Sequence, residues 1–472
     1  MNVVFEDVKN KLNLFDKSQS DGKGYTRVTM SPYFNRLDIT NRYTKLINPP
    51  SVGIDILGSP PANQYTVEFN YKLFPFRIYN NPKEFEGKYI IPVGVNRDPG
   101  FWSGMSKYSS LRVLNLPTDE WGHLFKLIKE EYLNDLKSKR AYLAIDTSLE
   151  GYHEHWVWDY FREGCKDYNI PLEQIIYISG NSIVEKDLER WKLENNNKKN
   201  VHAIGYPHFE WDMGNNKRNL EYEGKSLPTW LDHFKYKREN KDKIKTYNFL
   251  NRKPRMHRVW FYSILEEYNM LNKGLVSMNK ATSNLIRIGD RELDPDYVHY
   301  LNQDLPKILF EKGNMEQDAG FYINRFHPEE TKNSYVSIIS EARFEDEENT
   351  VFLSEKTFKT IACSHPFIIL GNKGSLKELR KLGYKTFHHA FHEGYDECEN
   401  VERMYAILDL LKNIHSQPDK LNDFMHWTRH AVERNLEVLK FNTLYNPPVG
   451  FHFLLELLNE DICTINSEKD LI

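Results

Sequence analysis

The stretch from Tyr335 to Phe387 constrains the fold of this chain more than any other part of the sequence. Tyr335 to Ser340 alternates and contains β-branched residues, which predicts a strand that ends at Glu341. Ser354 is a suitable N-cap for a following helix, and Phe367 to Leu370 is a short apolar run typical of a strand buried on both faces. A strand, a helix and a strand in this order predict two parallel strands joined by a crossover helix.

The same stretch carries charged side chains where open α/β sheets bind ligands. Glu341 follows the first strand at its carboxyl end. The helix capped by Ser354 contains Glu355, Lys356 and Lys359. Because the free N–H groups and positive dipole end of a helix attract anions, a nucleotide-linked substrate is the leading interpretation. The alternative is that Glu355 and Lys356 belong to a solvated first turn, as charged residues at helix starts usually do.

A second basic cluster lies upstream, between an apolar strand end at Tyr247 to Leu250 and a helix predicted over Val259 to Tyr268. Arg252, Arg255 and Arg258 are its arginines. Arginine can hold diphosphate oxygens with two parallel hydrogen bonds, and a helix N-terminus adds its dipole. The turn is therefore a candidate phosphate site, with an exposed basic loop as the alternative. Which arginine binds the phosphate stays open.

The length of 472 residues exceeds the size at which one hydrophobic core stops growing, so at least two domains are expected. The first hundred or so residues are rich in Pro, Gly, Asn and aromatic residues and contain strand-like pieces, which indicates β-rich additions. From Ala141 onward, strands alternate with helices. We therefore predict an α/β protein of two doubly wound, Rossmann-like domains, spanning residues 1–240 and 241–472.

Charge and cysteine content narrow the functional classes. The net charge is −4 and the isoelectric point is near 6.5, so nucleic acid is possible as a partner but not favoured. The four cysteines are scattered without metal-ligand spacing, which favours a reducing cytoplasm, the host cytoplasm if the protein is viral. The N-terminal residues lack the pattern of a secretory signal, and no apolar run long enough to span a membrane occurs.

Three motifs give the chain a family resemblance: SEA at Ser340 to Ala342, SEK at Ser354 to Lys356, and HPFIILG at His365 to Gly371. They resemble the donor-binding half of glycosyltransferase family 10, the GDP-fucose-dependent fucosyltransferases. They are still more similar to uncharacterised proteins of marine phages and giant viruses that carry SEKTxK and GSLxxLRxLGxKTF motifs. The resemblance covers at most the C-terminal half. This chain has SEARF where the family has FENS, which leaves the sugar and the nucleotide base open.

The resemblance implies the GT-B architecture, in which two doubly wound domains face a cleft and the second domain binds the sugar nucleotide. It implies transfer of a sugar, from a GDP-sugar by preference, to a glycan or another hydroxyl acceptor with inversion at the anomeric carbon. Glu341, Glu355 and Lys356 match family residues that contact the ribose and diphosphate of the donor. The turn at Arg252 matches a basic donor-binding segment more weakly.

Other candidate site residues follow from the predicted elements. If the reaction inverts, the first domain must supply a base, and the loop after the strand at Ala141 offers Glu150 as first choice and Asp146 as second. The alternative for Asp146 is a helix cap. Tyr395 and Asp396, just past a glycine, are placed to position the donor sugar.

No cofactor or metal is required by the sequence. Asp294 and Asp296 have the DxD spacing with which some glycosyltransferases hold a divalent ion, but the surrounding RELDPDYV indicates a turn and a helix start instead. Two other functions remain open. One is a DNA-modifying glycosyltransferase that acts on hydroxymethylated bases. The other is a non-catalytic protein that binds sugar nucleotides or glycans.

Overall fold

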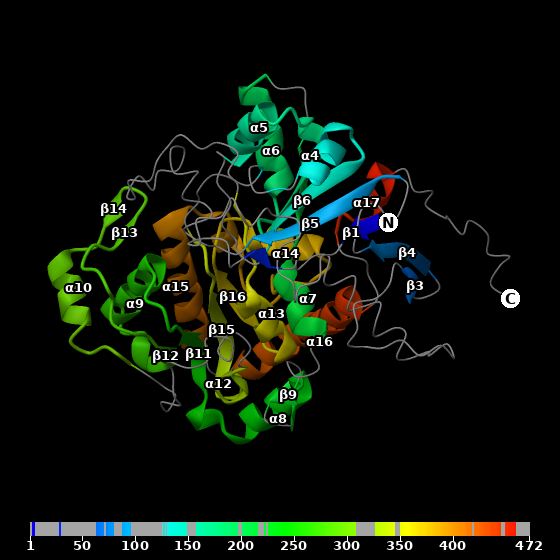
Figure 1. Ribbon diagram of the computed structural model, residues 1–472. Helices are drawn as coiled ribbons and strands as arrows, with labels where there is room; N and C mark the ends of the chain where they lie inside the picture. The colour runs from blue at the N-terminus through cyan, green and yellow to red at the C-terminus, as the bar shows by residue number, and fades with distance from the viewer. Residues whose placement is uncertain are drawn as a thin grey trace, which may run out of the picture. The chain divides into compact units, whose positions relative to one another are not determined.

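The computed structural model divides into two compact units (Figure 1). Unit 1 comprises Met1–His208 with Leu444–Ile472, and unit 2 comprises Phe209–Thr443. The structure describes residues 2–4, 28–29, 63–69, 72–79, 87–95, 125, 128, 130–148, 157–196, 201–215, 221–222, 225–307, 326–344, 350–417, 420–444 and 449–458.

The division falls earlier than the predicted boundary after residue 240 because helix α8 (Trp230–Glu239) is bonded to unit 2. The indole of Trp230 donates to the carbonyl of Met425 at 3.0 Å, and the imidazole of His233 lies 2.8 Å from the carbonyl of Cys363. The segment from Leu444 is grouped with unit 1, whereas the sequence placed it in the second domain.

Unit 1 is built on a largely parallel sheet with the strand order β3-β4-β1-β5-β6-β7-β8, and β2 pairs with β5. Strands β5 to β8 are added one after another in parallel, as the predicted βα units require, while β3 and β4 form an antiparallel pair. The strands are β1 (Asn2–Val4), β2 (Val28–Thr29), β3 (Asn63–Phe69), β4 (Lys72–Tyr79), β5 (Tyr89–Val95), β6 (Ala141–Thr147), β7 (Ile175–Ser179) and β8 (His202–Gly205).

The core of unit 1 forms where helices pack on these strands. Trp158 packs edge-on against Tyr177 at 5.4 Å between ring centroids, and its indole donates to Asp187 at 2.7 Å. That bond joins two helices, because Trp158 lies on α5 and Asp187 on α6. The helices of this unit are α4 (Glu130–Lys137), α5 (Val157–Asp167), α6 (Val184–Glu194) and α17 (Phe451–Leu457), and the division falls at the start of α7 (His208–Asn215).

Unit 2 contains a parallel sheet in the order β12-β11-β15-β16. Its strands are β11 (Lys245–Leu250), β12 (Gly274–Ser277), β15 (Ser334–Ser340) and β16 (Phe367–Leu370). Every residue of β15 and β16 is buried. This agrees with the apolar run from which β16 was predicted, whereas β15 was predicted from alternation and β-branched residues. Both units are therefore α/β with parallel strands.

All four strands are parallel, but the chain connections leave the two central strands, β11 and β15, toward opposite edges of the sheet. Helix α9 (Met256–Glu267) carries the chain from β11 outward to β12, whereas α13 (Glu355–Ala362) carries it from β15 outward to β16. Two neighbouring side chains show that these helices cover opposite faces. The hydroxyl of Ser340 accepts a hydrogen bond from Arg258 on α9, and the carboxylate of Glu341 accepts one from Thr357 on α13. The carboxyl ends of β11 and β15 therefore form a topological switch point.

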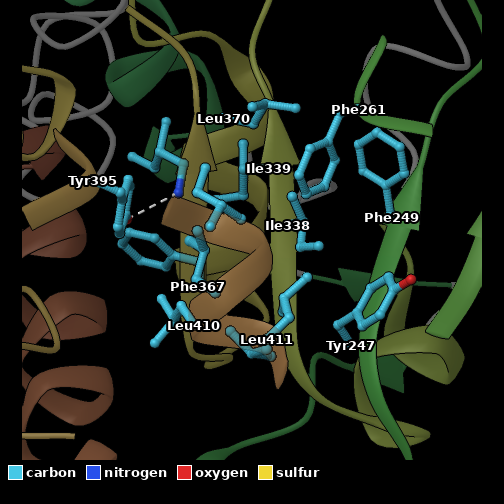
Figure 2. Packing of buried hydrophobic residues seen from close by; sticks show 14 of the residues in the cluster. Tyr247, Phe249, Phe261, Ile338, Ile339, Phe367, Leu370, Tyr395, Leu410 and Leu411 are labelled. Carbon is cyan, nitrogen blue, oxygen red and sulfur yellow. Dashed lines mark hydrogen bonds between the residues drawn. The ribbon is translucent and has the colours of Figure 1, made fainter. Parts of the chain in front are cut away.

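The core of unit 2 packs on both faces of the sheet (Figure 2). Phe249 on β11 meets Phe261 on α9 edge-on at 5.4 Å between ring centroids. The hydroxyl of Tyr395 accepts a hydrogen bond from the backbone N–H of Ile369 at 3.3 Å. The remaining elements of the unit are β9 (Glu221–Tyr222), β10 (Lys225–Ser226), β13 (Arg287–Ile288), β14 (Arg291–Glu292), α10 (Pro295–Leu301), α12 (Pro328–Lys332), α14 (Ser375–Lys381), α15 (Asn400–Ser416) and α16 (Leu421–Leu444).

A buried polar cluster lies between α8 and β15. The ammonium nitrogen of Lys237 is 3.2 Å from Nε2 of His365, and Nδ1 of the same imidazole is 2.8 Å from the hydroxyl of Ser337. Lys237 is 2% exposed. Burial lowers the pKa of Lys237 well below its usual range, because the charged form loses its hydration.

The pKa of Lys237 predicts a pH-dependent stability. An unfolded lysine has a pKa of about 10.4, so between that value and the lower folded value the unfolded chain binds more protons. The free energy of unfolding should therefore rise as the pH rises toward 10, and Lys237→Met should remove part of this slope. Urea unfolding between pH 7 and pH 10 measures it, with Lys235→Met on the exposed side of α8 as the control. Equal slopes in both variants would contradict the assignment.

Candidate functional site

The candidate site lies at the switch point of unit 2, at the carboxyl ends of β11 and β15. In open α/β sheets this is where the chain leaves a crevice for ligands. The turn from Arg252 to Arg255 follows β11, and Glu341 follows β15. The two segments that the sequence singled out separately are therefore neighbours in the structure, on adjacent strands.

Arg258 joins the two segments. Its guanidinium donates to the hydroxyl of Ser340, to the carbonyls of Ser340 and Glu341, and to the carbonyl of Lys253, each at 3.1 Å. Burial and, to a smaller extent, the Arg255 charge lower the pKa of Arg258 to about 10, so the group is charged at neutral pH. Since its donors are used on the protein itself and it is only 4% exposed, Arg258 braces α9 against β15.

Arg252 and Arg255 occupy different positions on the turn. Arg255 is half-buried, donates to the carbonyl of Ala342, and is the N-cap residue of α9 without a side-chain bond to that helix. Arg252 and the adjacent Lys253 are exposed. Of the three predicted arginines, Arg252 therefore presents the most accessible side chain to solvent.

Glu341 is fully buried, and its carboxylate lies beneath the first turn of α13. One oxygen accepts from the N–H of Ser354 at 3.1 Å and from the hydroxyl of Thr357 at 2.6 Å. The other accepts from the hydroxyl of Ser354 and from the N–H of Ala342 at 3.2 Å. The negative charge of Glu341 thus already occupies the place at this helix end where an anion would be attracted. Its contact with a donor stays a prediction.

The SEK segment begins α13 as the sequence predicted. Ser354 is the N-cap, and its hydroxyl accepts from the N–H of Lys356. The side chain of Glu355 is 15% exposed and pairs with the ammonium of Lys356 at 2.6 Å, while the side chain of Lys356 is 31% exposed. Burial alone would raise the pKa of Glu355, but Lys356 and Lys359 hold it below its usual range, so the carboxylate is ionised.

His257 is a residue at this site that sequence reasoning missed. Its Nε2 lies 3.1 Å from the carbonyl of Glu341, and its ring stacks on Phe344 at 5.3 Å between centroids. Burial lowers the pKa of His257 well below its usual range, and Arg258 and Arg255 lower it further. The imidazole is therefore neutral and donates to that carbonyl. A histidine in the first turn of a helix carries no sequence signal for such a role.

Tyr395 and Asp396 lie elsewhere in unit 2, in a short 3₁₀ turn at Gly394–Glu397. The carboxylate of Asp396 accepts from the N–H groups of Leu376 at 3.0 Å and Lys377 at 3.3 Å, so it caps the start of α14. Tyr395 is 3% exposed and bonded inside the core. Both side chains are held by the protein, and their predicted contact with a sugar stays a prediction.

The candidate bases belong to unit 1. Asp146 is 1% exposed at the end of β6, and its carboxylate accepts from the N–H of Ser148 at 2.9 Å. Glu150 lies outside the described residues. Asp294 caps α10 through the N–H of Asp296 at 2.9 Å, which confirms the predicted helix start.

Comparisons with protein-family models, with curated proteins and with solved structures give no match to this chain. In the part of the chain that the structure describes, no group of three or more His, Cys, Asp or Glu side chains is arranged to hold a metal ion. No described helix has the length and apolar character needed to cross a membrane. Functional assignment therefore depends on the chemistry of the switch point.

Replacing the buried carboxylate should destabilise unit 2. In Glu341→Ala, the N–H of Ser354 and the hydroxyl of Thr357 lose their acceptor, and each unsatisfied buried group costs about 1–3 kcal/mol. We expect the free energy of unfolding, measured by urea denaturation, to fall by about 3 kcal/mol or more. Glu329→Ala, which removes only an exposed ion pair with Lys332, should cost less than about 1 kcal/mol. Similar losses in the two variants would contradict the role given to Glu341.

Proposed function

We propose that this protein is a glycosyltransferase of GT-B type that uses a nucleoside diphosphate sugar, and that unit 2 binds the donor at the switch point between β11 and β15. A GDP-sugar is the favoured donor, and a glycan or another hydroxyl compound is the acceptor. The observation that carries the proposal is that the helix after the basic turn and the start of the SEK helix both bond Glu341 at the buried end of β15.

The charges at this edge favour a diphosphate. Among the described residues, the basic side chains outnumber the two carboxylates of Glu341 and Glu355, and Glu341 is already bonded beneath α13. The basic side chains are those of Arg252, Lys253, Arg255, Arg258, Lys356 and Lys359. A surplus of positive charge beside a helix N-terminus is the environment that phosphate groups require.

The same charges suit the chemistry of sugar transfer. The oxygen of the acceptor hydroxyl attacks the anomeric carbon, the bond from that carbon to the diphosphate oxygen breaks, and the nucleoside diphosphate leaves with the bonding electrons. Fixed positive groups such as Lys356 stabilise the negative charge that develops on the leaving group. A carboxylate accepts the proton of the hydroxyl, for which Glu150 and Asp146 are the candidates. The resemblance to family 10 supports inversion in this step.

The donor is testable by thermal shift with GDP, UDP, CDP and ADP. We expect GDP to stabilise the protein most. We expect Arg252→Ala and Lys356→Ala each to raise the dissociation constant by about tenfold to a hundredfold, the loss of one charge-assisted hydrogen bond. Lys440→Ala, an exposed residue of α16, is the control. If none of the four nucleotides binds, the donor site is wrongly assigned.

Release of the nucleoside diphosphate separates an enzyme from a binding protein. We expect the wild type to hydrolyse GDP-sugars slowly, as measured by the GDP released. The rate of hydrolysis should fall more in Lys356→Ala than in the Lys440→Ala control. A protein that binds GDP-sugars tightly and releases no GDP, with or without acceptors, would support the non-catalytic alternative.

A further inference from the structure

The two helix N-termini at the switch point differ in what already binds them. On α13, Ser354 caps the helix and the carboxylate of Glu341 lies below it. On α9, no side chain caps the first turn. Within the described residues, the backbone N–H groups of Met256 and His257 have no acceptor. In the first turn of α13 the N–H of Lys356 is thus bonded to the cap and a carboxylate lies below, whereas among the described residues the first turn of α9 has neither a side-chain cap nor such a carboxylate bond.

A buried amide lies between β11 and the same turn in the chain. Asn251 directly follows β11, is 5% exposed, and has a buried Nδ2 atom with no hydrogen-bond partner among the described residues. A buried polar group without a partner costs free energy, so its presence at the carboxyl end of a strand points to a ligand that satisfies it.

The strand pattern shows which face Asn251 occupies. Tyr247 and Phe249 point toward the α9 side, where Tyr247 donates to the carbonyl of Met270 and Phe249 packs on Phe261. The N–H of Asn251 still bonds the carbonyl of Ser277 at 2.8 Å, so the strand pairing continues to this residue. Because side chains alternate along a strand, Asn251 continues the row that faces α9.

The register places a second polar group beside it. The last printed pair of the parallel ladder is Asn248 with Ser337, and continuing this register by three residues sets Asn251 opposite Ser340. The hydroxyl of Ser340 faces α9 and accepts from Arg258. On this register Asn251 and Ser340 are polar residues on the α9 face at the carboxyl ends of adjacent strands, next to the turn that contains the exposed Arg252.

We propose that the diphosphate of the donor binds over the first turn of α9, with the amide of Asn251 donating to one of its oxygens, and not over the first turn of α13. This inference rests on the proposed function and deepens it. The SEK segment then contributes the ammonium of Lys356 and not its helix dipole. The Nδ2 atom of Asn251 has no hydrogen-bond partner within the described residues, so donating to the ligand breaks no existing bond.

Hydrogen exchange of the wild-type protein tests the location directly. With inorganic pyrophosphate, we expect slower exchange in peptides that cover residues 252–259, because the N–H groups of Met256 and His257 gain an acceptor. Peptides that cover residues 354–361 should change little. Protection of residues 354–361 without protection of residues 252–259 would overturn the inference.

A charge placed at Asn251 tests the role of the amide. Asn251→Asp keeps the shape and adds a negative charge, so we expect the dissociation constant for pyrophosphate and for GDP, measured by calorimetry, to rise at least tenfold. Asn413→Asp makes the same change on the exposed face of α15 and should alter binding less than twofold. Circular dichroism checks that both variants fold. If Asn251→Asp does not fold, the hydrogen-exchange experiment on the wild-type protein decides the question.

The outcomes separate this inference from the proposed function. If the wild type binds GDP and Asn251→Asp binds it equally well, the diphosphate does not contact Asn251, and the inference is wrong while the donor site stands. If the wild type binds neither pyrophosphate nor any nucleoside diphosphate, the proposed function itself is wrong.

Discussion

The candidate site of unit 2 depends on the buried carboxylate of Glu341. It satisfies the hydroxyl of Thr357 and the N–H of Ser354, and so holds α13 against the end of β15. The carbonyl of the same residue accepts from Arg258 and lies next to the imidazole of His257 on α9. One residue therefore fixes two helices on opposite faces of the sheet. A buried charge is tolerated there because nearby donors and the helix dipole replace its lost hydration.

This arrangement separates residues that build the site from residues able to contact a ligand. Arg258, His257 and Glu341 are buried and use their polar groups on the protein. Arg252 is exposed on the turn, and Lys356 is partly exposed above the buried carboxylate. Buried residues that hold the helices in place, together with exposed basic side chains, can orient a bound anion without a large cost in side-chain entropy.

Much of unit 2 follows from local sequence patterns. The predicted strand Phe367 to Leu370 has the bounds that the structure shows, and Ser354 caps α13 as predicted. Both depend on neighbours in the chain: an uninterrupted apolar run and a hydroxyl before a helix. Asn251 could also have been noticed, because it stands at the end of a predicted strand. The role of Arg403 could not have been noticed in the sequence, because its buried guanidinium donates to the carbonyls of Gly371 and Phe344, which are distant in the chain.

By itself, the sequence determined the alternation of strands and helices, the helix start at Ser354, and the two charged segments, because each depends on residues close together in the chain. The tertiary structure alone decided that β11 and β15, which precede the two segments, are adjacent strands, that Glu341 is enclosed beneath α13, and that Nδ2 of Asn251 is buried without a partner among the described residues. Strand order and the partners of buried polar groups join residues far apart in sequence, and no local pattern records those contacts.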